Sequence, residues 1–513
     1  MKLSGSVVLL SVLAGACAYA QSAAGGGQSA VVLPSSGRNN QGGSVGATEQ
    51  SVAGTTTSVN TLNPTVQVSG AYAGSASSTK AMPFSGKLSL QEALQRGLAY
   101  NLGAVGMTQA VRQTGAQVTV ARGALLPNVN GSIGETVEQT DLAAMGLRIN
   151  GPGFRFPTVV GPFNYFSLQA SLSQTVANLT TLNNYRAAKA TARASQYSLQ
   201  DARDLIALAV GGAYLQTLAA QARLDAAQAQ LDTANAVFHQ SNEQHGEGVL
   251  GKLSVDQNQV RVLTQQQQTI TLRNDLAKQK INLARITGLA PNAGYQLTDT
   301  FAFSPAPVQG VDAAVAQAEQ RRADLKAAQS QVDAAASAVA AARAERLPSL
   351  AVSGDYGAMG VNPAQSHGVF TVTGTLSIPI WQGGRAAGDI AQAEAALAQR
   401  QAELEDTRGQ IETQVREAYL DLEAAAGQVE VAQKNVQVAQ EALEMSRARM
   451  EAGVINTVEV VRAQETLSSA QLDMIDSVFA HNLAKLSLAR ALGQASDRIS
   501  TLLKPEAASE VVR

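Results

Sequence analysis

The sequence contains very little cysteine, aromatic side chain or charge. Among its 513 residues there are one cysteine and one tryptophan, and aromatic residues make up 4%. Charged residues make up 15%, whereas about 25% is usual in soluble domains. A single cysteine excludes a disulfide within the chain. A formal net charge of −2, with no run of lysine or arginine, excludes a general attraction for nucleic acid.

Residues suited to catalysis or metal binding are also scarce. The four histidines, His239, His245, His367 and His481, lack ligand spacing such as i, i+4. The glycine pairs and triplets are not followed by the Lys-Ser/Thr pair of a phosphate-binding loop. We therefore predict that the protein is not an enzyme and binds no metal or cofactor.

Long apolar runs are absent after the N-terminus. Lys2, an apolar stretch over residues 7–14 and the small residues of Ala18-Tyr19-Ala20 predict a signal peptide at residues 1–20. No later window approaches the ~20 continuous apolar residues that a membrane helix needs. If the protein enters a membrane, we expect it to do so through β-strands.

Cys17 offers a second interpretation of this leader. Residues 13–17 loosely resemble a lipoprotein signal, in which the cysteine is lipidated, but Ala14 stands where that pattern has a large aliphatic residue. Cleavage after Ala20 satisfies the small-x-small rule and is the favoured interpretation. It leaves a mature chain without cysteine.

Residues 21–86 are rich in glycine, serine, threonine and asparagine. Such a composition does not bury enough apolar surface to offset the entropy of ordering the chain. We predict that this stretch is a flexible extension.

The rest of the chain contains an internal repeat. Gly248-Val249-Leu250 corresponds to Gly453-Val454-Ile455 at an offset of 205 (453 − 248), and Ala213-Tyr214-Leu215 corresponds to Ala418-Tyr419-Leu420 at the same offset. Self-similarity at this length indicates a duplicated module. We expect the two copies to supply equivalent parts of a pseudo-symmetric assembly.

Proline is missing from two long stretches, between Pro162 and Pro291 and between Pro379 and Pro505. Because a proline inside a helix costs about 3 kcal/mol, these stretches permit very long helices. Apolar residues recur in them at alternating steps of four and three, and large residues alternate with alanine, as in coiled coils. This pattern predicts helices at about 180–245 and 385–450, roughly 100 Å long each.

Both predicted helices end near a glycine, Gly248 in the first repeat and Gly453 in the second. Glycine at this position allows a helix to end in a tight turn. Helical patterns resume at about 253–288 and 457–493, so each long helix is expected to form a hairpin. Shorter helices, which begin near residues 90 and 312, are expected to continue the rows of the returning helices.

Between the helical stretches, apolar residues alternate with hydroxyl and amide residues. The segments at about 165–176 and 369–380 each have about the eleven residues that a tilted strand needs to cross a bilayer. Partner strands are predicted at about 127–138 and 348–357. A soluble half-buried sheet has the same alternation, so the pattern alone does not require a membrane.

Three observations favour the membrane. The chain carries an export signal, and four strands cannot close a barrel alone. Aromatic residues suited to an interfacial belt lie near the first hairpin: Phe154, Phe156, Phe163, Tyr165 and Phe166. Because an open sheet edge is excluded in lipid, several chains must contribute strands to one barrel. The connection within the first hairpin is the longer one, as in the outer loops of such barrels.

A family resemblance rests on short motifs that recur in order in both repeats. They are Leu88-Ser89-Leu90-Gln91-Glu92-Ala93-Leu94, Leu126-Pro127-Asn128, Ala213-Tyr214-Leu215 and Gly248-Val249, then Arg322-Ala323-Asp324-Leu325, Leu347-Pro348-Ser349-Leu350, Ile378-Pro379-Ile380-Trp381-Gln382-Gly383-Gly384-Arg385, Ala418-Tyr419-Leu420 and Gly453-Val454. Over about residues 88–505 the chain resembles the TolC family of outer-membrane efflux proteins. The first repeat departs from the family pattern at Val176-Ala177-Asn178-Leu179, where the second keeps Pro379 and Gly383-Gly384.

This resemblance implies a mainly α fold with membrane β structure. Three copies would form a twelve-stranded outer-membrane barrel, four strands from each, joined to a long periplasmic α-helical barrel. It implies an exit duct of a tripartite efflux or type I secretion system, which exports small molecules or proteins passively. The implied partners are a periplasmic adaptor (membrane fusion protein), an inner-membrane transporter and outer-membrane lipid.

The resemblance also assigns roles at the helical tips. Adaptors would dock on Gly248, Val249, Leu250, Gly453, Val454 and Ile455. A periplasmic constriction would be formed from Lys252, Ser254, Asp256, Glu459 and Arg462. Ser254 stands where the family often has Asp, and Ile455 stands where one member has Arg, so the ion-pair gate of that member does not transfer intact. Our hypothesis is that Glu459, with Lys252, lines the narrow end. The alternative is that these are solvated charges on helix surfaces.

The predicted organisation is thus a signal peptide (1–20), an extension (21–86), a first repeat (87–300), a linker (301–311), a second repeat (312–505) and a tail (506–513). Two other classes of function stay open. A periplasmic adaptor would have a helical hairpin, and an exported coiled-coil structural or adhesin protein would explain the heptads. Neither explains two sets of amphipathic strand pairs.

Overall fold

The computed structural model describes residues 44–52, 61–76, 82–146, 150–151, 154–155, 157–305, 310–452, 454 and 457–502. All of these residues fall within one unit. The predicted signal peptide, the interpretation of Cys17 and the predicted tail at 506–513 lie outside the described residues.

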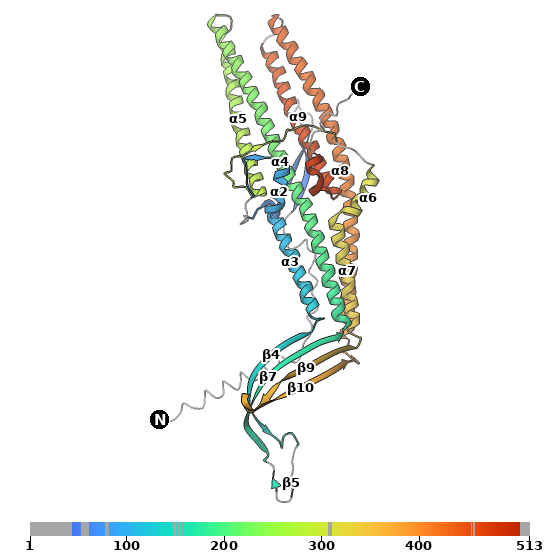
Figure 1. Ribbon diagram of the computed structural model, residues 1–513. Helices are drawn as coiled ribbons and strands as arrows, with labels where there is room; N and C mark the ends of the chain where they lie inside the picture. Colours follow the sequence, from blue (N-terminus) through green and yellow to red (C-terminus); the bar gives the residue numbers. More distant parts are fainter. Residues whose placement is uncertain are drawn as a thin grey trace, which may run out of the picture. The chain divides into compact units, whose positions relative to one another are not determined.

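The two repeats have the same order of elements, two short helices, two long strands and a helical hairpin (Figure 1). The first repeat consists of α2 (Leu90–Tyr100), α3 (Leu102–Gly123), β4 (Asn128–Asp141), β7 (Val159–Ala177), α4 (Leu179–Gly246) and α5 (Lys252–Thr287). The second consists of α6 (Val311–Arg321), α7 (Ala323–Ala344), β9 (Ser349–Gly360), β10 (Ser366–Ser377), α8 (Arg385–Glu451) and α9 (Thr457–Ala491). The long helices begin and end within two residues of the predicted positions, whereas β7 begins six residues before its predicted start at about 165.

The helices pack through the apolar stripe that the sequence contains. Ile206 and Val210 of α4, and Ile411 and Val415 of α8, are fully buried. α4 packs against α3, α5, α7 and α9. An apolar window of α4 is long enough to cross a membrane by length and composition, but 78% of it is buried within the protein. We therefore assign this window to the core that joins the two repeats.

The segment predicted to be a flexible extension is partly ordered, so that prediction is wrong for residues 44–52 and 61–76. Strands β1 (Val45–Val52) and β2 (Thr61–Val68) form an antiparallel hairpin, which is followed by a 3₁₀ turn at Gly70–Ala73. Val66 packs on Gly212 of α4 so closely that a Cβ at position 212 would lie 2.5 Å from its side chain. The absence of a side chain at Gly212 of α4 therefore lets β2 pack closely on this helix, which composition alone does not predict.

The four long strands form one antiparallel sheet with the order β10-β9-β7-β4. The two hairpins of the repeats are joined by the pairing of β7 with β9. In the part of the chain that the structure describes, β4 and β10 each pair with one strand only and so each have an open edge. The sheet thus consists of four strands and has two open edges at which strands of other chains could pair.

Smaller elements complete the fold. They are the parallel pair β3 (Lys87–Leu88) and β8 (Gln296–Leu297), the short pair β5 (Asn150–Gly151) and β6 (Phe154–Arg155), the 3₁₀ turn η2 (Pro363–Gln365) and α10 (Ala495–Leu502). Tyr214 of α4 is buried and donates its hydroxyl hydrogen to Asp299, at 2.6 Å between the oxygens. Asp299 also accepts from the backbone N–H of Leu90, so one carboxylate ties α4 to the start of α2.

Candidate functional site

The first helical tip is a closed turn between α4 and α5. Gly248 adopts a left-handed φ of 77°, and its N–H donates to His245 O at 3.0 Å. The N–H of Val249 donates to Gln244 O at 2.9 Å. These two bonds form a Schellman motif, which satisfies the carbonyl groups at the helix end and requires the left-handed residue that glycine supplies. The ring Nδ1 of His245 lies 2.7 Å from Leu250 O and closes the turn further.

The second tip shares one of these two bonds. The N–H of Val454 donates to Arg449 O at 2.9 Å, which is the bond equivalent to that of Val249. Gly453 and Ile455 lie outside the described residues. Val249 is 75% exposed and Val454 is 72% exposed. The two hairpins therefore present an apolar side chain at equivalent places, and backbone hydrogen bonds within each turn hold it there.

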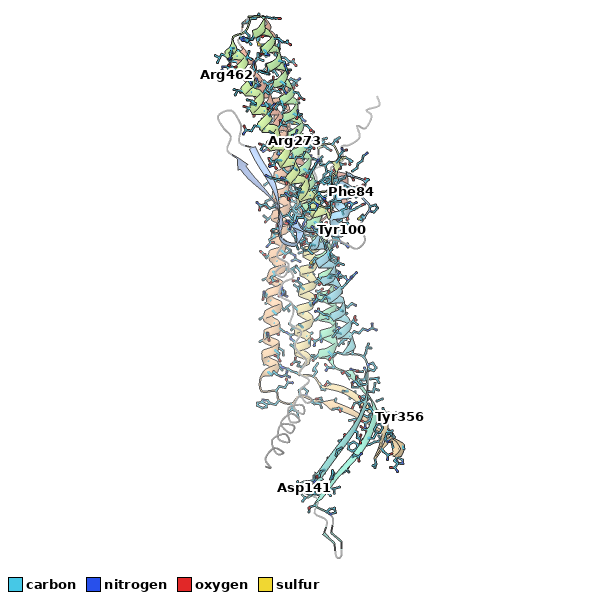
Figure 2. All side chains as sticks on the ribbon, turned by 90° about the vertical axis from the view of Figure 1, so that its left-hand side faces the viewer. Phe84, Tyr100, Asp141, Arg273, Tyr356 and Arg462 are labelled. Atoms are coloured by element: carbon cyan, nitrogen blue, oxygen red, sulfur yellow. The ribbon has the colours of Figure 1, made fainter. Side chains whose placement is uncertain are left out.

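The five predicted constriction residues lie on the first turns after the tips. Lys252 and Asp256 are exposed and Ser254 is half-buried, at the start of α5. On α9, Glu459 is 54% exposed and lies 3.5 Å from Arg462, one turn further along. Figure 2 shows Arg462 close to the tip. The i, i+3 spacing of this pair makes it a helix-surface ion pair within one chain.

Sequence reasoning did not find the contacts that hold the hairpins together. Asn258 of α5 donates its side-chain N–H to Ser241 Oγ of α4 at 2.6 Å, and both residues are buried. The sequence does contain a clue to this contact, because Ser241 is a polar residue at a position of the apolar stripe of α4. Arg223 of α4 and Asp476 of α9 form an ion pair at 2.5 Å, which joins the hairpins of the two repeats.

The exposed sheet has one apolar and one polar face. Val129 and Ile133 of β4 lie opposite Leu172 and Leu168 of β7. The same face includes Tyr356 of β9 and, on β10, Phe370 and Val372. The opposite face carries Ser, Thr, Asn and Gln side chains, including Ser132, Gln169, Ser353 and Thr373. Figure 2 shows Tyr356 and Asp141 on this sheet.

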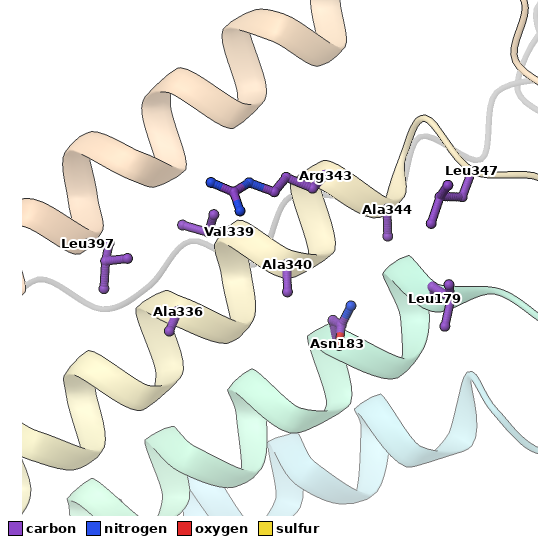
Figure 3. A pocket seen from close by; sticks show the side chains of 9 residues that line it. All are labelled: Leu179, Asn183, Ala336, Val339, Ala340, Arg343, Ala344, Leu347 and Leu397. Atoms are coloured by element: carbon purple, nitrogen blue, oxygen red, sulfur yellow. The ribbon is translucent and has the colours of Figure 1, made fainter.

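A hollow lies where the helices meet the sheet. Its volume is about 620 Å³. It is bordered by residues of α4, α7 and α8 and by the chain leading to β9 (Figure 3): Leu179, Asn183, Ala336, Val339, Ala340, Arg343, Ala344, Leu347 and Leu397. Arg343 Nη2 lies 2.7 Å from Glu394 Oε1 and so bridges α7 and α8. The lining is mostly apolar and offers no chemistry beyond packing and this ion pair.

Buried charges gather where the two repeats meet. Arg490 of α9 forms an ion pair with Asp201 of α4. Burial alone would lower the pKa of Arg490, but Asp201, Asp324 and Asp204 raise it. Burial likewise raises the pKa of Asp324, but the hydrogen-bonded guanidinium of Arg322 outweighs this and lowers it. This cluster therefore stabilises the charged forms of Arg490 and Asp324.

Among the described residues, no group of three or more His, Cys, Asp or Glu side chains could hold a metal ion. His481 of α9 lies against Phe303 and, through its ring Nε2, 3.2 Å from Ser304 O. Burial lowers the pKa of His481. This histidine thus anchors the segment between the two repeats.

The family model described as outer membrane efflux protein matches residues 94–289 and 314–494 of this chain. The pyoverdine export outer membrane protein OpmQ of Pseudomonas putida is 30% identical over 194 residues, which are 36% of this chain and 40% of that protein. The chain thus spans about two fifths of the length of this curated relative.

Solved structures share the fold. The outer membrane protein VceC of Vibrio cholerae has a TM-score of 0.67 at 18% identity, over 79% of this chain and 96% of that one. The CmeC outer membrane channel of Campylobacter jejuni has a TM-score of 0.67 at 19% identity, over 79% and 86%. The MtrE outer membrane channel of Neisseria gonorrhoeae has a TM-score of 0.66 at 17% identity, over 83% and 96%.

Proposed function

This chain belongs to the outer membrane efflux protein family, and from that membership we propose that it is a passive exit duct in the outer membrane of a Gram-negative-type bacterium. Three copies close a twelve-stranded barrel, and their helices extend the channel into the periplasm. An inner-membrane transporter supplies the energy, and a periplasmic adaptor connects it to the duct. The cargo consists of small molecules or proteins.

The observation that carries this proposal is the four-stranded sheet with one exposed apolar face and two unpaired edges. In water an apolar face that extends over four strands would be covered by other protein. In lipid an open edge would leave backbone groups without hydrogen bonds. A barrel built from several copies satisfies both demands. Four strands per copy and three copies give the even number that outer-membrane barrels have.

The edge helix α8 supports an assembly of several copies. Val431, Val438 and Met445 recur at seven-residue intervals on α8 and are exposed in the single chain. Leu420 is 66% exposed, although its counterpart in the first repeat, Leu215, is buried. A heptad stripe of this kind is typical of a helix that packs against another helix. We infer that a neighbouring copy covers it.

The experiment that tests the function combines location with transport. We expect the protein to fractionate with the outer membrane and to run on gels as a trimer that dissociates on heating. Deleting its gene should raise the cellular accumulation of a dye exported by the system several-fold, and pyoverdine-type siderophores are a second cargo to measure because of the relative's name. A soluble periplasmic monomer would contradict the proposal and favour an adaptor. A surface protein without effect on accumulation would favour an adhesin.

The two tips are proposed as the adaptor-docking surface, with Val249 and Val454 as its apolar contacts. Replacing both residues with aspartate should reduce export at least tenfold, because a carboxylate buried in an apolar contact costs several kcal/mol and each 1.4 kcal/mol is a factor of ten. The measurements are dye accumulation and copurification of the adaptor. The trimer should persist, since the turns are held by backbone bonds.

The matched control is Val260→Asp, which places the same charge on an exposed position of α5 further from the tip. It should leave export close to that of the parent. If the tip double variant exports as well as the parent, then docking does not use these valines.

A further inference from the structure

The repeat relates the two strand hairpins residue by residue. An offset of 221 takes β4 to β9 (349 − 128), and an offset of 204 takes β7 to β10 (377 − 173). In the first hairpin, Ile133 lies opposite Leu168. Their counterparts at the same offsets, Gly354 and Val372, lie opposite each other in the second hairpin. The two hairpins therefore share one register. The offset of 221 also relates Leu126-Pro127 to Leu347-Pro348 (347 − 126), just before the hairpins, and so is supported independently of the strand pairing.

The same offsets apply to the pairing that joins the two repeats. Within the chain, β7 pairs with β9, and Gln169 lies opposite Gly357. In a closed ring of repeats, β10 of one copy meets β4 of the next as β7 meets β9. Adding 204 to Gln169 of β7 gives Thr373 of β10, and subtracting 221 from Gly357 of β9 gives Thr136 of β4. We propose that neighbouring copies join through an antiparallel β10–β4 seam in which Thr373 faces Thr136 of the next copy.

This seam keeps the two faces of the sheet continuous. It places Val372 opposite Val137 and Leu376 opposite Ile133, and all four side chains are exposed in the single chain. A shift of one residue would put threonines on the apolar face and valines on the polar face, because side chains alternate along a strand. The pattern of the two faces therefore excludes shifts by one residue, or by any odd number, without use of the offsets.

Glu135 distinguishes this register from shifts of two residues. Glu135 lies on the apolar face of β4, and its Oε1 accepts a hydrogen bond from Asn164 Nδ2 at 2.9 Å. In the proposed seam it faces Gly374 of the neighbouring copy, and a Cβ at position 374 would meet nothing within 4 Å in the single chain. The missing side chain leaves room for the Glu135–Asn164 pair. A shift of two residues would place Val372 or Leu376 over the carboxylate, which apolar groups disfavour.

Cysteine cross-linking tests the seam, which rests on the proposed trimer. The double variant Thr136→Cys/Thr373→Cys should form disulfides, because directly opposed residues have Cα atoms about 4.5–5.5 Å apart and disulfides span about 4.4–6.8 Å. Within one chain the ladders place Thr373 level with Asn128 of β4, which is eight residues from Thr136. Thr136 and Thr373 of the same chain therefore lie roughly 30 Å apart. After mild oxidation and boiling, a non-reducing gel should show a covalent trimer that a reductant dissociates. The single variants show whether Cys17 contributes.

Two further variants test the register. Thr373→Cys combined with Gly134→Cys or with Glu138→Cys represents shifts of two residues, at about 7–8 Å between Cα atoms, and should not cross-link. Cross-linking of either pair in place of the first would overturn the register and leave the trimer intact. A protein that runs as a trimer but cross-links through none of the pairs overturns it as well. A monomer in the outer membrane without cross-links would overturn the proposed function itself.

Discussion

Replacing Arg490 with methionine is expected to destabilise the folded protein by about 3–5 kcal/mol, the usual cost of removing one partner of a buried ion pair. Arg490 is only 9% exposed, and its guanidinium is the cation for Asp201. Asp204 and Asp324 lie near enough to raise its pKa. Methionine fills similar volume but leaves the Asp201 carboxylate without its cation, and this unpaired charge causes the loss.

The repeat provides a matched control. Arg285 is the counterpart of Arg490 at the offset of 205 (490 − 285), and it is exposed. Arg285→Met should change the unfolding free energy by less than about 0.5 kcal/mol, as surface substitutions do. The measurement is denaturant unfolding of the detergent-solubilised protein, followed by circular dichroism. Equal midpoints for the two variants would show that the cluster around Arg490 does not stabilise the fold.

Long-range order along the helices and strands could be predicted from the sequence because it depends on periodicity. The absence of proline permits long helices, the steps of three and four residues identify their packed stripe, and the alternation at 165–176 and 369–380 identifies the strands. The turn between α4 and α5 could also be predicted, because glycine is the residue that favours the left-handed conformation of a Schellman turn, and Gly248 adopts it.

Contacts between distant segments could not be predicted in this way. The hairpin of β1 and β2 has the composition of a disordered tail, yet its strands pair with each other and Val66 packs on Gly212 of α4. Likewise, the sequence repeats arginine at positions 285 and 490, yet only Arg490 is buried. The duplicated sequence specifies the residue type, whereas the neighbours of each copy decide its environment. The roles assigned to the tips and to the constriction stay predictions.

Replacing Gly357 with valine is expected to reduce the amount of assembled trimer in the outer membrane at least tenfold. Gly357 lies on β9, opposite Gln169 of β7. A Cβ at this position would lie 2.1 Å from Leu168 O and 2.8 Å from Gln169 Cα. Both atoms belong to the backbone of β7, so no side-chain rotation relieves the clash. A glycine in a strand interior often marks such a close backbone approach.

The clash affects the pairing on which closure of the barrel depends. β7 and β9 join the hairpins of the two repeats, so separating them creates two additional open edges in every copy, and open edges are excluded in lipid. Gly354→Val is the matched control on the same strand. Its Cβ would lie 3.4 Å from the nearest atom, Thr371 O, on the apolar face, where valine suits lipid. The heat-modifiable trimer band should persist for Gly354→Val and disappear for Gly357→Val. A full trimer band for both variants would mean that β7 and β9 do not approach this closely in the assembled barrel.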